Sequence, residues 1–324
     1  MKRTLIIALT GIAVLAAGCR FHSAERHVQP VAVALSIKPD GAFTRVTGAA
    51  PADGALFFGT NLNPGCWMPV RRGIFAFNCY TSNSLPASAS FLPLAAVPSS
   101  MDYTRGSPRL PLMSVTFDAG DMEEYAEQNL ALLKREGIKT TIFLSGKFIE
   151  RYPNVVREIM AAGHEAGNHT FSHPHLKYEE KTADGKIVER YRLPPKELTL
   201  AEKAFQAVTR TAMVPFWRAP YDQHCAEIRA QAWQLGYVHA CWSWDSLDWV
   251  SDPHDSLFEP PGALWKRYRK LVDGDSKNLY GTILLFHLSA HRTDEIEKII
   301  NDVRQRGILL VPLTTLLASQ AMNP

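Results

Sequence analysis

The sequence is poor in cysteine, has little net charge and contains only one long apolar run. Five cysteines in 324 residues leave room for at most two disulfides. A net charge of +3 argues against a nucleic-acid partner, because such proteins present a dense basic cluster. After residue 18, no apolar run reaches the roughly 20 residues of a membrane-spanning helix. No internal repeat is evident, and the 46% hydrophobic fraction allows an ordinary core.

The single apolar run lies at the N-terminus and predicts export. Lys2 and Arg3 precede apolar residues 5–17, and small residues follow at 16–18, as in a secretory signal peptide. The stretch Ala16-Ala17-Gly18-Cys19 resembles a bacterial lipobox, in which the cysteine becomes the lipidated N-terminus. We therefore expect a signal peptide over 1–18, a lipid anchor at Cys19, and a location at the bacterial cell envelope on the periplasmic face of a membrane. An ordinary signal peptide followed by a chance cysteine is the alternative.

The other four cysteines suit an exported protein, in which disulfides persist. Cys66 and Cys79 flank a segment with a turn signal at Arg72-Gly73, which predicts a hairpin and a Cys66–Cys79 bridge. For Cys225 and Cys241, a second bridge and two buried free thiols are both open.

The rest of the chain divides by composition. Residues 19–30 form a polar tether, and residues 31–98 show short strand-like runs between turn signals, which predicts a small β-sandwich-like module. A linker over 99–109 precedes residues 110–324, where strand-like and helix-like segments alternate. That alternation indicates a parallel sheet in an incomplete (β/α) barrel. A polar insertion at 179–195 predicts a loop or hairpin at its rim.

Chemically active side chains follow the predicted strands, at the edge where such barrels carry their active sites. They are Asp118, His169, His173, Arg218, Tyr221, Asp245, Asp248 and His287. His169 and His173 would share one face of a helical turn and could bind one metal ion. This spacing alone is weak evidence; the other clusters strengthen it.

Five of these stretches together resemble the polysaccharide deacetylase family, the NodB-homology domain of carbohydrate esterase family 4. The resemblance covers about residues 110–317. The motifs, in chain order, are Thr116-Phe-Asp-Ala-Gly120, His169-Thr-Phe-Ser-His173, Arg218-Ala-Pro-Tyr221, Asp248-Trp249 and Leu285-Phe-His287.

The resemblance implies hydrolysis of N-acetyl groups on a polysaccharide such as peptidoglycan, poly-N-acetylglucosamine or a chitin-like oligomer. A divalent metal polarises the amide carbonyl and lowers the pKa of its water, and Zn²⁺ suits imidazole ligands. Asp118 is the candidate base and His287 the candidate acid. By resemblance, Asp248 orients His287, Arg218 holds Asp118, and the Tyr221 backbone N–H binds the oxyanion. Trp249 is the first candidate for stacking on a sugar ring.

One departure concerns the metal. Ala119 stands where the family has a metal-binding aspartate, so His169 and His173 need a third group, either Asp118 or Asp121. The segment 121–124 also has the pattern of a capping box for the next helix. Two other functions stay open: a non-catalytic glycan-binding relative that lost a metal ligand, favoured by Ala119, and an O-acetyl esterase.

Overall fold

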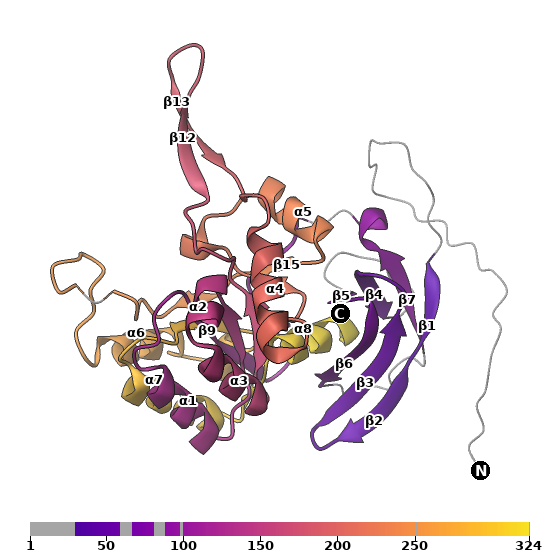
Figure 1. Cartoon of the computed structure of the whole chain (residues 1–324). Helices are drawn as coiled ribbons and strands as arrows, with labels where there is room; N and C mark the ends of the chain where they lie inside the picture. The colour runs from indigo at the N-terminus through magenta and orange to yellow at the C-terminus, as the bar shows by residue number, and fades with distance from the viewer. Residues whose placement is uncertain (1–29, 59–66, 81–87, 98–99, 251, 324) are drawn as a thin grey trace.

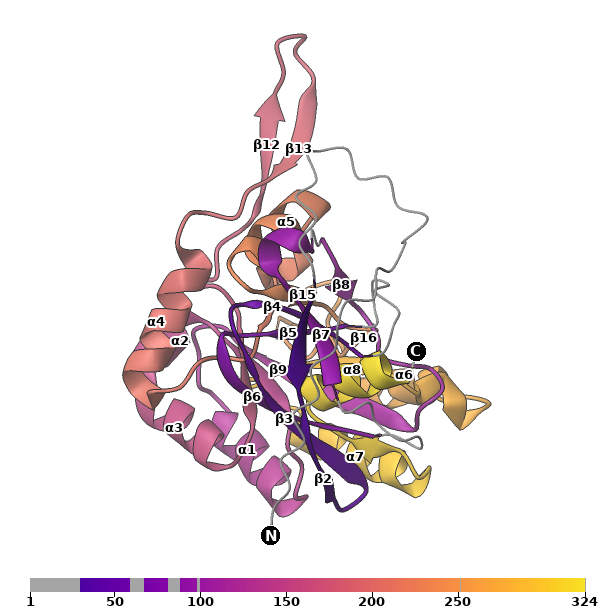
Figure 2. The same cartoon turned by 90° about the vertical axis from the view of Figure 1, so that its right-hand side faces the viewer.

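The computed structural model describes residues 30–58, 67–80, 88–97, 100–250 and 252–323. Two antiparallel sheets occupy the N-terminal part, and a curled parallel sheet wrapped by helices forms the rest (Figures 1 and 2). The proposed signal peptide, Cys19 and the tether up to residue 29 lie outside the described residues. Within the described ranges, no helix combines the length and the apolar character that crossing a membrane requires.

The N-terminal part contains seven strands in two sheets. One sheet has the order β1-β7-β4-β5 and the other β2-β3-β6, with antiparallel pairing throughout. The strands are β1 (Val31–Ala34), β2 (Ser36–Asp40), β3 (Phe43–Ala50), β4 (Gly54–Phe58), β5 (Trp67–Val70), β6 (Gly73–Cys79) and β7 (Ser88–Pro93); a short 3-10 helix, Leu94–Ala96, follows.

The predicted hairpin around Arg72-Gly73 is wrong. β5 pairs with β4, whereas β6 pairs with β3, so the turn joins two different sheets rather than two neighbouring strands. Cys79 is a buried free thiol that donates to the Thr44 carbonyl. The predicted bridge is therefore absent at Cys79; Cys66 itself lies outside the described residues. Cys225 and Cys241 are also free thiols, so the second bridge is absent; Cys241 is buried, as the alternative held, whereas Cys225 is half-buried.

The parallel sheet runs β16-β17-β9-β10-β11-β14-β15-β8, and β18 also pairs with β9. The path has two ends, β16 and β8, so the barrel is incomplete. All eight residues of β9 are buried, as expected for a parallel strand covered on both faces. The strands are β8 (Asp102–Tyr103), β9 (Leu112–Ala119), β10 (Thr141–Leu144), β11 (Glu165–Asn168), β14 (Phe216–Trp217), β15 (Val238–Ala240), β16 (Trp244–Asp245), β17 (Ile283–His287) and β18 (Leu309–Leu310).

Amphipathic helices cover the outside of this sheet. In α7, residues 296, 299, 300 and 303 recur on one side and are buried, which is the spacing of a core-facing stripe. The helices are α1 (Ala126–Arg135), α2 (Gly146–Arg151), α3 (Pro153–Ala161), α4 (Glu197–Thr209), α5 (Ala226–Gln234), α6 (Ala263–Leu271), α7 (Thr293–Gln305) and α8 (Leu313–Met322); short 3-10 helices lie at Pro220–Asp222 and Ser276–Leu279.

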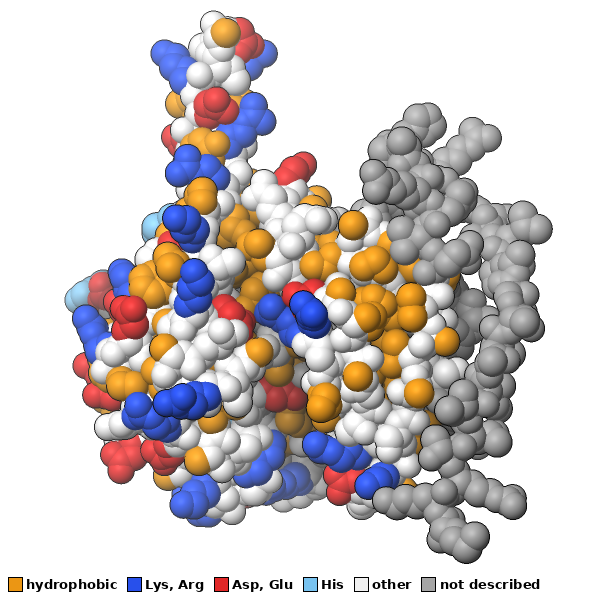
Figure 3. Space-filling view, turned by 45° about the vertical axis from the view of Figure 1, so that its right-hand side comes forward, with side chains coloured by type: hydrophobic (Ala, Val, Ile, Leu, Met, Phe, Trp, Pro, Cys, Tyr) orange, Lys and Arg blue, Asp and Glu red, His pale blue; other side chains and the backbone are white. Residues whose placement is uncertain are grey.

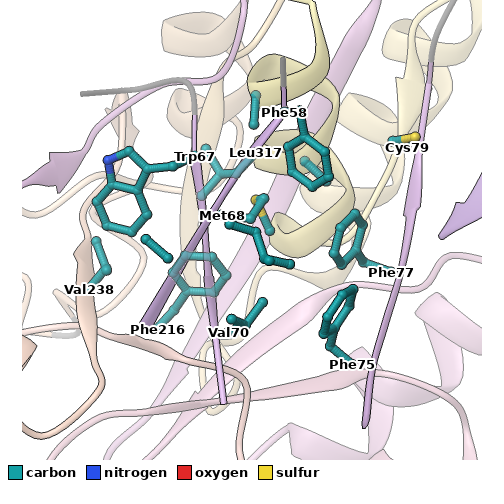
Figure 4. Packing of buried hydrophobic residues seen from close by; sticks show 14 of the residues in the cluster. Phe58, Trp67, Met68, Val70, Phe75, Phe77, Cys79, Phe216, Val238 and Leu317 are labelled. Carbon is teal, nitrogen blue, oxygen red and sulfur yellow. The ribbon is translucent and has the colours of Figure 1, made fainter. Parts of the chain in front are cut away.

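The N-terminal sheets and the barrel share one hydrophobic cluster. Trp67 of β5 lies against the barrel side chains Phe216 and Val238, and Leu317 of α8 reaches the same cluster (Figure 4). Trp67 and Trp233 face each other with ring centroids 5.1 Å apart. This apolar contact fixes the β module against the side of the barrel that carries β14 and β15.

A long hairpin projects from the barrel at the predicted insertion. It consists of β12 (Lys177–Lys181) and β13 (Ile187–Tyr191), and charged side chains of both signs cover it (Figure 3). The predicted fold class, an incomplete (β/α) barrel preceded by β-sheet structure, is confirmed.

Candidate active site

The candidate residues converge at the carboxyl ends of the parallel strands. Asp118 is the penultimate residue of β9 and is paired in register with His287 at the end of β17. Asn168 at the end of β11 pairs with Trp217 of β14, so the segments that follow, His169 and Arg218, emerge side by side. All five motifs therefore meet at one edge, as parallel topology requires.

Asp118 and Arg218 form a buried ion pair, with Nη1 donating to Oδ1 over 2.7 Å. Arg218 is fully buried, and its other donors are also used: Nη2 bonds Thr116 Oγ1 (3.0 Å) and the Cys241 carbonyl (3.0 Å), and Nε bonds the Ala240 carbonyl (2.9 Å). Burial by itself would raise the pKa of Asp118. The Arg218 guanidinium, together with smaller contributions from His169 and His287, outweighs burial and holds that pKa below its usual value, so Asp118 is a carboxylate at neutral pH.

His169 and His173 point their Nε2 atoms at each other over 3.2 Å. His169 Nδ1 donates to the Arg218 carbonyl (3.0 Å), so the proton of the ring is on Nδ1 and Nε2 carries a lone pair. This Nε2 lies 3.6 Å from Asp118 Oδ2. The predicted helical turn is wrong, because 169–173 is a loop in which Thr170 (φ 64) and His173 (φ 54) are left-handed. The loop, rather than a helix, brings the two rings together.

Glu197 secures this loop, although nothing in the sequence marked it. Its carboxylate accepts from the N–H groups of Phe171 and Ser172, both at 2.8 Å, and from Ser172 Oγ at 2.8 Å. Glu197 is the first residue of α4, a helix that the sequence did not predict. The loop residues that it contacts lie about 25 residues earlier in the chain.

The two histidines are uncharged. Burial lowers the pKa of His169, and burial together with the neighbouring His169 lowers the pKa of His173 to about 3. Neutral imidazoles are the form that binds metal. A tetrahedral ion with bonds of about 2.0–2.2 Å holds its ligand atoms about 3.3–3.6 Å apart. His169 Nε2 lies 3.2 Å from His173 Nε2 and 3.6 Å from Asp118 Oδ2, and both separations are close to that spacing.

The structure separates the two candidates for the third ligand. Asp118 contacts His169, whereas Asp121 is exposed and, among the described residues, forms no ion pair with either histidine. The predicted capping box is also wrong, because α1 begins at Ala126 with Tyr125 as its N-cap. The Ala119 methyl is 1% exposed and belongs to an apolar cluster of the barrel.

His287 and Asp248 form the second polar pair of the site. His287 Nδ1 donates to Asp248 Oδ1 (2.8 Å), and the His287 backbone N–H donates to Oδ2 (3.0 Å), so ring and backbone are held by one carboxylate. Burial opposes charging of this imidazole, but the carboxylates of Asp248, Asp118 and Asp245 together outweigh burial and raise the pKa of His287. Asp245 instead accepts from the Leu247 N–H (2.8 Å), the turn-forming role of an ordinary loop aspartate.

Two aromatic side chains are exposed among the motifs. Tyr221 is 55% exposed and has a left-handed backbone (φ 57); its hydroxyl lies 3.2 Å from His173 Nδ1, and His175 stacks on its ring. Trp249 is 49% exposed next to buried Asp248. Trp217 and Trp233 are core residues.

A second group of metal-ligand side chains lies behind the Arg218–Tyr221 segment: Asp102, His224 and His239, with Asp222 and Cys241 beside them. The ring nitrogens of its two histidines already take part in hydrogen bonds. His239 bonds Asp102 through Nδ1 (2.7 Å) and the Ala219 N–H through Nε2 (3.1 Å), and His224 Nδ1 accepts from Arg229 (2.6 Å). We therefore describe this group as a hydrogen-bond network.

Comparison with known proteins agrees with this arrangement. The polysaccharide deacetylase family model matches residues 105–240. A peptidoglycan-N-acetylglucosamine deacetylase of Bacillus cereus is 28% identical over 63% of this chain and 67% of its own length. A chitooligosaccharide deacetylase of Sinorhizobium fredii is 28% identical over 49% of this chain and 71% of its own length. The chain spans only 59% of one further relative, YlxY of Bacillus subtilis.

Solved structures show the same fold. A carbohydrate esterase family 4 pseudoenzyme from Bacillus anthracis superposes with a TM-score of 0.57 at 22% identity, covering 70% of this chain and 72% of that one. Residues 105–240 of this protein match the polysaccharide deacetylase family. Within it, the relatives with named activities are deacetylases of peptidoglycan and of chitooligosaccharides.

Proposed function

We propose that this protein hydrolyses N-acetyl groups of an N-acetylhexosamine polysaccharide, with a zinc ion held by His169 and His173 and with Asp118 as the nearest third group. The observation that carries the proposal is the position of His169 Nε2 next to both His173 Nε2 and the Asp118 carboxylate, beside a separate imidazole–carboxylate pair. A site that only bound glycan would not require this second pair.

A bound divalent ion would polarise the acetyl carbonyl and acidify a water molecule. Asp118, which Arg218 holds through Oδ1, would serve as the base that accepts a proton from the attacking water. His287, whose pKa is raised by Asp248, would donate a proton to the leaving amine. The Tyr221 backbone N–H is our candidate for stabilising the oxyanion, and the exposed Trp249 ring for packing on a sugar.

Acetate release tests this function. Residues 20–324, purified with zinc, should release acetate from peptidoglycan, poly-N-acetylglucosamine or a chitin oligomer, and mass spectrometry should show the matching loss on the glycan. Comparison with an O-acetylated glycan separates amide hydrolysis from esterase activity. Release only from the O-acetylated substrate would replace the first proposal with the esterase.

Ala119 favours one competing function, a glycan-binding relative without catalysis. That protein would retain affinity for the polymer but release no acetate at any zinc concentration. A single titration that follows both glycan binding and acetate therefore distinguishes the two.

We also propose that the protein is exported and anchored by lipid at Cys19, on the basis of the N-terminal residues alone. Its substrate would then be a polymer of the cell envelope, within reach of a tethered enzyme.

A further inference from the structure

The peptide group between Arg218 and Ala219 is hydrogen-bonded at both ends. Its C=O accepts from His169 Nδ1 (3.0 Å), and its N–H donates to His239 Nε2 (3.1 Å). His239 Nδ1 in turn lies 2.7 Å from Asp102 Oδ1. One continuous line of bonds therefore runs from Asp102 through His239 and a single peptide unit to His169.

The backbone groups fix the direction of every bond in this line. A peptide N–H can only donate, so His239 Nε2 accepts, and its Nδ1 carries the proton that is donated to Asp102. A carbonyl can only accept, so His169 carries its proton on Nδ1 and presents a bare Nε2 toward His173. Burial lowers the pKa of His239 to about 4, in keeping with a neutral ring.

The line is built into the sheet. His239 is 1% exposed in β15, and its register partner in the neighbouring strand β8 is Asp102. Trp217 packs edge-on against the His239 ring (4.9 Å), and the His224 ring lies 4.2 Å from it. Asp102 precedes the segment 105–240 that matches the family model, so an upstream strand contributes this carboxylate.

Such a line affects the histidine at its far end. The Asp102 carboxylate makes His239 Nε2 a stronger hydrogen-bond acceptor. That stronger bond polarises the Arg218–Ala219 peptide, and its C=O then becomes a stronger acceptor for the Nδ1 proton of His169. Hydrogen bonds in series strengthen one another, and the partner of a ligating histidine sets both its orientation and its basicity.

We propose that Asp102 and His239 are positioning residues for His169, which orient its ring and raise its affinity for the metal through the Arg218–Ala219 peptide. The inference rests on the metal site of the proposed function, but not on the reaction.

The test is the zinc dissociation constant of residues 20–324, measured by competition with a chromogenic chelator. Asp102→Asn keeps an oxygen able to accept from His239 and removes only the charge. We expect its zinc affinity to fall about tenfold, the lower end of the effect of such partners. His239→Gln, which retains an acceptor for the Ala219 N–H but no bond to Asp102, should show a similar loss. Asp222→Asn is the matched control, because Asp222 bonds His224 in the same cluster but lies outside the line.

A second readout separates positioning from packing. The Tm of Asp102→Asn in excess chelator should stay within about 4 °C of wild type. Unchanged zinc affinity in Asp102→Asn and His239→Gln would overturn the inference, as would an equal loss in Asp222→Asn. Absence of zinc binding by the wild type would overturn the metal site and this inference together. Tight zinc binding without acetate release would refute only the proposed reaction.

Discussion

Arg218 is the side chain whose replacement should be most costly, and Arg218→Lys isolates its geometry from its charge. The guanidinium is fully buried and bonds four partners, namely Asp118, Thr116 and the carbonyls of Ala240 and Cys241. An ammonium group has three donors in a different geometry and cannot reach all four at once. At least one buried partner is therefore left without a bond.

The magnitude follows from that loss. A buried acceptor left unsatisfied costs about 1–3 kcal/mol, and the different geometry of lysine also weakens the ion pair with Asp118, whose complete loss would cost about 3–5 kcal/mol. We expect Arg218→Lys to lower the free energy of unfolding by about 3 kcal/mol at pH 7, measured by urea denaturation followed by fluorescence. Arg190→Lys is the control, because Arg190 pairs with Glu180 on the exposed hairpin; an exposed pair contributes less than about 1 kcal/mol.

The same variant should respond to pH. The folded-state pKa of Asp118 lies below its usual value, so its ion pair stabilises the protein above that usual value, and this stabilisation is lost as pH falls through the folded pKa. The stability difference between wild type and Arg218→Lys should therefore shrink in acid. A difference below about 1 kcal/mol at pH 7, or one that grows in acid, would refute the reasoning.

Three further predictions concern the acid, the vacant ligand position and the anchor. Because Asp248 raises the pKa of His287, Asp248→Asn should move the alkaline limb of the kcat–pH profile to lower pH. A limb that does not move would exclude His287 as the proton donor. Ala119→Asp places a carboxylate in an apolar cluster, so it should lower the Tm measured in chelator. Because it restores a ligand, zinc should raise the Tm of this variant more than that of wild type. An equal rise would show that position 119 does not reach the metal. Cys19→Ser in the full-length protein should move it from the membrane fraction to the soluble fraction, and a wild-type protein without lipid mass would contradict the anchor.

The sequence was sufficient to predict the motifs and their meeting place, because parallel strands bring their carboxyl ends to one edge whatever the details. It was insufficient for the loop geometry. His169 and His173 have a helical spacing, yet left-handed residues at 170 and 173 and the carboxylate of Glu197 hold them in a loop. Glu197 precedes no recognisable motif, so only the fold reveals its contact.

Contacts between distant segments account for the other errors and omissions. The turn at Arg72-Gly73 has hairpin chemistry, but the burial of Trp67 against the barrel directs β5 and β6 to different sheets. Asp102 and His239 are 137 residues apart, and only the register of β8 against β15 makes them partners. Local patterns contain no information about either pairing.

The most direct test of the central claim is acetate release by metal-free protein as zinc is added back, with His169→Ala and His173→Ala run in parallel. The account predicts no release from the metal-free wild type, recovery that saturates near one zinc per chain, and no recovery in either variant. Full activity in excess chelator, or recovery in both histidine variants equal to that of the wild type, would contradict a metal-dependent deacetylase with its ion at these two histidines.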